Sequence, residues 1–176
     1  MLPIPRHLRE IFKADLEKSN EHNLEGAIRC SCGCEKFKIK TFSDLYNKGN
    51  SISCEMYKGG YVLVIKGICK DCNKEWLIFD FSKHGYDGLV CKDGIEITED
   101  ERLKEYVCPK CKENSFEMWL WIEVEDKEQF IEEVVEEYPE EFEEGDYVDA
   151  FNWLAGKLKC DCCKNELTEW LNMELS

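Results

Sequence analysis

Two short stretches, residues 108–111 (CPKC) and residues 160–163 (CDCC), decide the fold of this chain. Two similar stretches precede them, residues 30–34 (CSCGC) and residues 69–72 (CKDC). A tight turn that carries two cysteines presents both thiols on one side, and two such turns supply the four sulfurs of a tetrahedral zinc site. The sequence therefore predicts two sites, each built from two cysteine pairs that are far apart along the chain.

The first two stretches supply the ligands of the first site, and the last two supply those of the second. The predicted ligands are Cys30, Cys32, Cys69 and Cys72 for one Zn²⁺ and Cys108, Cys111, Cys160 and Cys163 for the other. Two alternatives stay open, because Cys34 could replace Cys30, and Cys162 could replace Cys160 or Cys163. We prefer Cys30, since Gly33 then stands where the turn needs a positive φ. Four cysteine ligands leave no open coordination position, so both ions are expected to be structural.

The two halves of the chain repeat each other around these pairs. Equivalent positions are 79 residues apart in the first part of the repeat and 91 apart in the second, namely Cys32 and Cys111, Phe37 and Phe116, and Cys69 and Cys160. Each half reads as a cysteine pair, an aromatic strand, an insertion, a second pair and a further strand. The offset grows by 12 residues, which places an expansion inside the second half.

Each half resembles the zinc ribbon family, over residues 28–81 and 106–171. The resemblance rests on the cysteine pairs and their flanking strands, and it implies a three-stranded antiparallel sheet per half, nucleated by one structural zinc ion. The spacing between the pairs is long: 36 residues in the first half and 48 in the second, where compact sites have roughly 15–20. The inserts are therefore expected to be folded, as a hairpin in the first half and as helices in the second.

The predicted fold class is α+β, with two small antiparallel zinc-ribbon sheets, an N-terminal helix and a helical acidic insertion in the second module. Apolar residues at helical spacing predict the first helix over residues 5–18. Asp126 is a suitable N-cap for a helix that runs to about Tyr138, and residues 147–155 indicate another. The expected division is 1–26 for the N-terminal helix and linker, 27–94 for the first ribbon with its hairpin insertion and linker, and 95–176 for the second ribbon with its acidic insertion.

The composition favours a soluble, metal-binding protein. The 176 residues are 43% hydrophobic and 35% charged, which is too apolar for a disordered chain and too polar for a membrane protein. The chain has 12 cysteines and begins without an apolar signal segment, which favours metal over disulfides and a cytoplasmic location. The net charge of −15 argues against a broad phosphate-binding surface.

The negative charge is concentrated in residues 123–149, which carry 14 acidic residues and one basic residue, Lys127. Such a field accelerates the encounter with a basic partner. The predicted function is a non-catalytic protein-interaction or adaptor module that meets a basic protein through Glu132, Glu133, Glu136, Glu137, Glu140, Glu141, Glu143 and Glu144. The alternative is a nucleic-acid- or transcription-associated zinc ribbon, disfavoured by the charge, that would use Arg29, Lys36, Lys38 and Lys40.

No enzymatic site is predicted. The sequence shows no nucleophile–base pair, no phosphate-binding glycine loop and no open metal site. His84 would need a partner such as Asp87 or Cys91 to act as a general base, and we expect it instead in a turn that joins the two halves. His7 is expected on the surface.

Two tryptophans, Trp119 and Trp121, fall on one face of the strand predicted for residues 116–124. The acidic helices must bury their apolar residues against a neighbouring surface. We therefore expect these helices to cover the two tryptophans.

Overall fold

A computed structural model describes residues 2–46, 51–97 and 102–175 as a mixed structure in which strands dominate. The strands are β1 (Phe12–Ala14), β2 (Asn23–Ile28), β3 (Phe37–Phe42), β4 (Asp44–Tyr46), β5 (Ser51–Ser53), β6 (Glu55–Tyr57), β7 (Gly60–Val62), β8 (Val64–Cys69), β9 (Glu75–Asp80), β10 (Lys104–Tyr106), β11 (Phe116–Glu123), β12 (Trp153–Cys160) and β13 (Glu166–Glu174). The short helices are η1 (Arg6–Leu8), η2 (Asp87–Cys91), α1 (Lys127–Phe130), η4 (Ile131–Val135) and η5 (Glu144–Val148).

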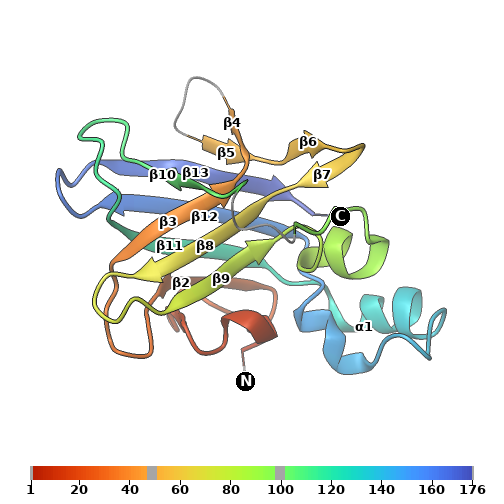
Figure 1. The fold of residues 1–176 in the computed structure, drawn as a ribbon. Coiled ribbons are helices and arrows are strands. Elements are labelled where there is room, and N and C mark those ends of the chain that lie inside the picture. Colours follow the sequence, from red (N-terminus) through yellow and green to blue (C-terminus); the bar gives the residue numbers. More distant parts are fainter. Residues whose placement is uncertain (1, 47–50, 98–101, 176) are drawn as a thin grey trace.

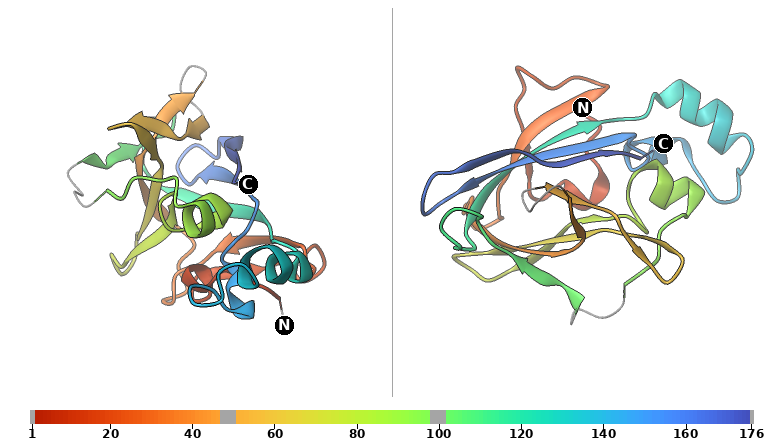
Figure 2. Two further views of the ribbon diagram at one scale, coloured as in Figure 1. Left: turned by 90° about the vertical axis from the view of Figure 1, so that its right-hand side faces the viewer. Right: turned by 90° about the horizontal axis from the view of Figure 1, so that it is seen from above.

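Eleven strands form one sheet (Figure 1), in the order β4-β5-β13-β12-β11-β3-β8-β9, with β1, β2 and β10 joined at its side. Strands β6 and β7 form a separate hairpin. The sheet folds over where β11 meets β3, so that β11, β12 and β13 form one layer and β3, β8 and β9 form the other (Figure 2). The prediction of two separate small sheets is therefore wrong, because strands from both halves pair with one another in one continuous sheet.

An approximate two-fold axis passes between Phe37 and Phe116. Phe37 pairs with Cys69 in the first half, and Phe116 pairs with Cys160 in the second. The two phenylalanines also pair with each other where β3 meets β11. A two-fold axis requires such pairing between equivalent residues. The sequence repeat is therefore a structural repeat as well.

The two halves also exchange their leading strands. Strand β2 precedes the first cysteine pair but pairs with β11 of the second half, and β10 precedes the third pair but pairs with β3 of the first half. The registers are equivalent. Ala27 lies three residues before Cys30 and pairs with Trp119, three residues after Phe116. Glu105 likewise lies three residues before Cys108 and pairs with Lys40, three residues after Phe37. Each half therefore completes the sheet of the other.

One continuous core lies between the two layers. Phe37, Phe79, Phe116 and Trp170 are all fully buried in it. Tyr106 lies on β10, which pairs with β3, and contacts the opposite layer: its ring centroid is 5.7 Å from that of Phe116 on β11 and 5.7 Å from that of Trp170 on β13. In Figure 1 the cysteine turns lie at the left-hand end of the sheet and the acidic insertion at the right-hand end. The cysteine groups and the acidic segment are thus at opposite ends of the molecule.

The predicted N-terminal helix is wrong. Residues Arg6–Leu8 form a single 3₁₀ turn, and Phe12–Ala14 form strand β1, which pairs with β2. The apolar spacing does not reflect one buried helical face. Leu8 and Ile11 are buried in the core, whereas Leu16 is 79% exposed. Pairing with β2 satisfies the backbone of β1, and such non-local pairing overrides local helix propensity.

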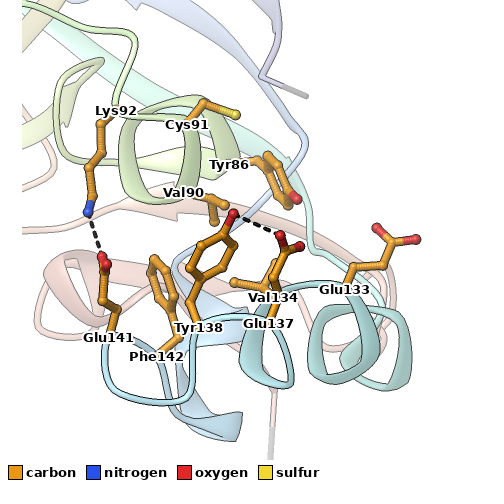
Figure 3. Close-up of a pocket in the computed structure, with 10 residues that line it drawn as sticks. All are labelled: Tyr86, Val90, Cys91, Lys92, Glu133, Val134, Glu137, Tyr138, Glu141 and Phe142. Atoms are coloured by element: carbon orange, nitrogen blue, oxygen red, sulfur yellow. Dashed lines mark hydrogen bonds and ion pairs between the residues drawn. The ribbon is translucent and has the colours of Figure 1, made fainter.

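The acidic insertion begins with a helix, as predicted. The Asp126 side chain accepts a hydrogen bond of 3.0 Å from the Gln129 amide, and α1 with η4 continues to Val135, short of the predicted end at Tyr138. Val134 belongs to a buried apolar cluster against which Val90 of η2 packs, and both residues line the pocket shown in Figure 3. Across the described part of the chain, no helix has the length and apolar character needed to cross a membrane.

The helix predicted over residues 147–155 is wrong. Residues Glu144–Val148 form the 3₁₀ helix η5, and β12 already begins at Trp153. The reason is again pairing between distant strands, because β12 is held by β11 on one side and by β13 on the other.

Candidate metal centres

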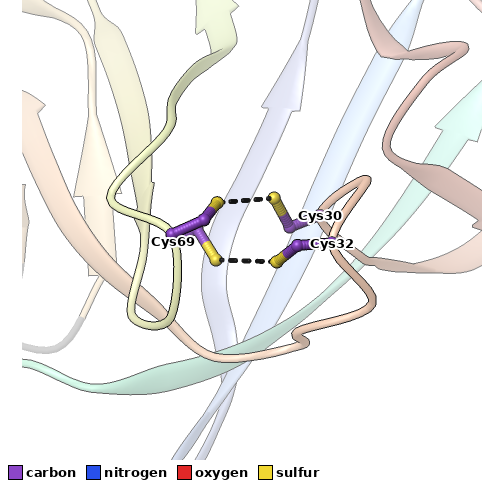
Figure 4. Close-up of side chains that lie close together, drawn as sticks. Cys30, Cys32 and Cys69 are labelled. Atoms are coloured by element: carbon purple, nitrogen blue, oxygen red, sulfur yellow. Dashed lines mark hydrogen bonds between the residues drawn. The ribbon is translucent and has the colours of Figure 1, made fainter.

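The first cysteine group lies between the turn that joins β2 to β3 and the turn that joins β8 to β9. Figure 4 shows Cys30 and Cys32 on one turn and Cys69 on the facing turn, with their sulfurs directed toward one another. The Sγ atoms of Cys30 and Cys72 are 3.6 Å apart, those of Cys32 and Cys69 are 3.5 Å apart, and all four lie within 4.8 Å. Zn–S bonds of about 2.3 Å in a tetrahedron place the sulfurs about 3.8 Å apart. The group could therefore hold a metal ion.

The second group has the same geometry in the other half. The Sγ atoms of Cys108 and Cys163 are 3.6 Å apart, those of Cys111 and Cys160 are 3.5 Å apart, and all four lie within 4.8 Å. This group could also hold a metal ion. The structure thus brings the eight predicted ligands together in the predicted fours.

The four turns share two backbone features. In each turn the residue after the second cysteine has a positive φ and donates its amide to the carbonyl oxygen of the first cysteine, over 2.8 to 3.0 Å. These residues are Gly33, Asn73, Lys112 and Lys164. The positive φ predicted for Gly33 is confirmed, at 94°. The shorter spacing between Cys30 and Cys32 therefore preserves the turn.

The two alternative ligands lie outside both groups. The Sγ atom of Cys34 accepts a hydrogen bond of 3.4 Å from the Lys36 amide instead. Cys162 is exposed to solvent. Of the choices that the sequence left open, the geometry favours Cys30 in the first group and Cys160 with Cys163 in the second.

The thiols within each group differ in acidity. Burial raises the pKa of Cys30, but hydrogen bonds from the Cys32 amide and the Trp76 indole outweigh it and lower this pKa to about 6. Burial of Cys108 is likewise outweighed by the amides of Cys111 and Lys110, which bring its pKa to about 7. Burial raises the pKa of Cys160 to about 12. A bound divalent cation would favour the thiolate form of all four cysteines in a group.

Trp76 is a supporting residue that the sequence analysis missed. Its Nε1 donates a hydrogen bond of 3.4 Å to the Sγ atom of Cys30, and Lys74 Nζ lies 3.7 Å from the centroid of the indole ring. Such hydrogen bonds orient ligands and stabilise thiolates. The signal that could have identified Trp76 is a difference within the repeat: the equivalent position in the second half is Leu167, which has no N–H group on its side chain.

His84 forms a stacked pair with His7, and within the described residues it has no hydrogen bond to Asp87 or Cys91. The two imidazole centroids are 3.6 Å apart, His84 Nδ1 accepts from the Asp80 amide over 3.0 Å, and His7 Nε2 lies 3.1 Å from the Ile78 carbonyl oxygen. Burial lowers the pKa of His7 to about 4 and that of His84 to about 2. The surface position expected for His7 is therefore wrong, and both rings are neutral and packed.

A third group of possible ligands combines Asp87, Cys91 and Asp93, which also lie within 4.8 Å. Cys91 and Asp93 are exposed. Burial and the neighbouring Asp93 raise the pKa of Asp87. The two carboxyl groups and the thiol lie on a single loop, whereas each four-cysteine group draws its ligands from two turns that are distant in sequence.

The acidic helix does not cover Trp119 and Trp121, contrary to the prediction. Its Phe130 and Val134 pack on the η2 segment instead. The tryptophans remain half-buried on the outer face of the sheet, where Lys157 Nζ lies 5.1 Å from the Trp119 ring centroid.

Comparisons of the chain with protein-family models, with curated proteins and with solved structures give no match. The class of the protein therefore rests on its two cysteine groups. They define a mainly β protein with two four-cysteine sites, compatible with tandem zinc modules.

Proposed function

We propose that this protein is a non-catalytic interaction module, in which two structural zinc ions hold a sheet that presents an acidic surface to a basic protein partner. The observation that carries the proposal is the set of exposed, unpaired carboxylates at the end of the molecule opposite the cysteine groups. A cytoplasmic location agrees with eight free thiols gathered for metal.

Zinc is the metal that the ligand set favours. Four thiolates in a tetrahedral arrangement suit Zn²⁺, and they leave no position for water or substrate. Both sites are therefore assigned a structural role. Each zinc site joins two turns that are distant in sequence, so metal binding and folding are coupled.

The acidic surface is formed by Glu132, Glu133, Glu136, Glu137 and Glu140. All five are exposed, and within the residues that the structure covers none makes an ion pair. The other three predicted glutamates have cationic neighbours: Glu141 lies 2.8 Å from Lys92, Glu143 lies 3.7 Å from Arg6, and Glu144 lies 3.2 Å from Lys127. The five unpaired carboxylates are thus the ones free to meet a cationic partner.

Nucleic acid is the weaker alternative. Of the four basic residues predicted to contact it, two have acidic partners: Arg29 lies 3.3 Å from Glu35, and Lys36 lies 2.9 Å from Asp161. These contacts reduce the positive field that phosphate binding needs.

The test is fluorescence anisotropy with two labelled probes, an octa-arginine peptide and a single-stranded oligothymidine of 12 nucleotides, at low salt. The wild-type protein should bind the peptide, with affinity that falls as salt rises, and should leave the oligonucleotide free. Neutralising the five glutamates of the acidic surface to glutamine should remove peptide binding.

A matched control keeps the change in charge but moves it elsewhere, to Glu17, Glu21, Glu35, Glu105 and Glu113, which are all exposed. This control variant should bind the peptide nearly as well as the wild type. Failure of the wild type to bind the peptide, or binding of the oligonucleotide instead, would refute the proposed function.

A further inference from the structure

A pocket of about 410 Å³ lies between the acidic helix and the η2 segment. It rests against the acidic surface described above, and the inference drawn from it builds on the proposed function. Figure 3 shows the rings of Tyr86 and Tyr138 with Glu137 between the two segments, and Lys92 reaching across to Glu141. The pocket is thus lined by side chains from both segments.

The lining combines carboxylates with aromatic rings. Glu133 lies in η4, and Glu137 and Glu141 lie in the turns that follow it. Tyr86, Tyr138 and Phe142 contribute the rings. Carboxylates beside ring faces are the chemistry that recognises organic cations, through ion pairing and cation–π attraction.

The protein's own Lys92 shows how a cation sits at one end of this pocket. Its Nζ lies 2.8 Å from Glu141 Oε2 and 6.0 Å from the centroid of the Phe142 ring. The other end keeps Glu133 and Glu137, which have no cationic neighbour in the described part of the chain, and the ring of Tyr138, which is 45% exposed. One end of the pocket is therefore occupied by an internal ammonium group, and the other is open to an external cation.

The electrostatic environment agrees with this assignment. Burial raises the pKa of the Tyr86 hydroxyl, and Cys91 and Glu133 raise it further, so the field in the pocket is negative. A divalent metal is not the expected occupant, since these three glutamates do not form one of the groups of oxygen or sulfur ligands that lie within 4.8 Å of one another in the described residues.

We propose that this pocket binds the guanidinium group of an arginine side chain presented by the basic partner. Guanidinium is planar, so it can lie over the rings of Tyr86 and Tyr138 while its N–H groups donate to the carboxylates of Glu133 and Glu137. An ammonium group donates to the same carboxylates but lacks the planar stacking. The pocket therefore distinguishes arginine from lysine as well as basic from neutral segments.

The experiment compares two double variants of the full chain with the same loss of charge. Glu133→Gln with Glu137→Gln changes the pocket, whereas Glu132→Gln with Glu136→Gln changes the same helix one residue earlier, outside the pocket lining. Binding of labelled octa-arginine and octa-lysine peptides is measured by anisotropy, and circular dichroism verifies that each variant is folded. We expect the pocket variant to lose about tenfold or more in affinity for octa-arginine, and the control to lose less than about threefold.

A second pair of variants tests the rings without changing charge. Tyr138→Leu should weaken octa-arginine binding about two- to fivefold, in line with an exposed cation–π contact, while Tyr138→Phe should bind like the wild type. Equal losses in the two double variants would overturn the pocket but leave the acidic surface as a diffuse docking site. Equal affinity for the arginine and lysine peptides would overturn the choice of guanidinium, and no binding of either peptide to the wild type would remove the proposed function itself.

Discussion

The two halves share one pattern of strand pairing but protect their cysteine groups by different means. In the first group Cys32 and Cys72 are exposed, whereas in the second Cys111 and Cys163 are half-buried. Only the first group receives an indole N–H, from Trp76, because a leucine stands at the equivalent position in the second. The same sulfur geometry is thus supported by hydrogen bonding at an exposed site and by burial at a covered one.

The insertions make the second difference between the halves. The first half carries the small hairpin of β6 and β7, and the second carries the acidic segment with its pocket. The approximate two-fold symmetry therefore holds for the cysteine turns and their strands and ends where the insertions begin. Stability comes from what the halves share, and the proposed binding surface comes from what distinguishes them.

We expect the largest effect on stability when one buried cysteine ligand is replaced. Zinc binding at structural sites contributes about 10–16 kcal/mol, and Cys108 is fully buried in the common core. Replacing Cys108 with serine should therefore abolish cooperative thermal unfolding of the whole chain, measured by circular dichroism, and lower the zinc content measured by elemental analysis. Cys162→Ser is the matched control, since Cys162 is exposed in a neighbouring turn, and it should keep both properties. A Cys108→Ser protein that melts like the wild type would contradict the assignment.

Separating the halves tests the exchange of leading strands. Residues 1–94 lack the strand β10 that completes the edge of β3, and residues 95–176 lack the strand β2 that completes the edge of β11. We expect the fragments to be unfolded alone and to form a 1:1 complex when mixed with zinc, measured by size-exclusion chromatography with light scattering.

The control for this mixing experiment is Gly26→Val in the first fragment. A Cβ atom at Gly26 would lie 2.4 Å from the Lys13 carbonyl oxygen, so the substitution should displace β1 from β2 and weaken the association. Two fragments that fold separately as monomers would show that the predicted division at residues 94 and 95 is a true domain boundary.

A smaller effect should distinguish the two sites by their rates of metal release. A chelator should remove zinc in two phases, with the exposed first group giving the fast phase. Trp76→Phe removes the indole hydrogen bond to Cys30 and should accelerate the fast phase roughly tenfold, since hydrogen bonds to charged groups contribute about 1.5 kcal/mol or more.

Trp153→Phe is the matched control for that release experiment, because its indole N–H donates to Asn172 over 2.7 Å and not to sulfur. Both phases should keep their wild-type rates in this variant. An unchanged fast phase in Trp76→Phe would show that the indole does not stabilise the first site.

A pH-dependent effect concerns the stacked histidines, which belong to neither cysteine group. Native His7 and His84 have pKa values of about 4 and about 2, below the ordinary 6.5, so the unfolded chain takes up protons first as the pH falls. The stability is complete above about pH 6.5 and decreases towards pH 4, by roughly 3 kcal/mol from His7 alone. In urea unfolding followed between pH 7 and 4.5, His7→Phe should show a shallower decrease than the wild type. His22→Gln, a change at an exposed histidine, should follow the wild-type profile, and parallel profiles for all three proteins would exclude the linkage.

The sequence predicted what depends on short spacing. The turn at Cys30 and Cys32 needs a residue with positive φ directly after it, and Gly33 supplies that residue. The ligands in this turn could therefore be predicted from residues 30–34 alone. The 79-residue offset between Phe37 and Phe116 indicated a repeat because equivalent positions carry equivalent side chains. The grouping of the cysteines followed from both.

The sequence did not predict what depends on distant pairing. Leu8 and Ile11 have the spacing of a helix, yet β1 forms because β2 lies beside it, and no local pattern encodes that neighbour. The position of the acidic helix was also predicted wrongly. Phe130 could pack on any apolar surface, and the choice between the Trp119 face and η2 is made by the path of the chain and not by composition.

The reciprocal placement of β2 and β10 also dictates an order of events during synthesis. Ala27 cannot pair with Trp119 until Trp119 has been synthesised, about 90 residues later, which takes roughly 5–20 s at usual elongation rates. For that interval the nascent first half has an incomplete hydrogen-bonding edge, and a chaperone or early zinc loading would protect it from misassembly with neighbouring nascent chains.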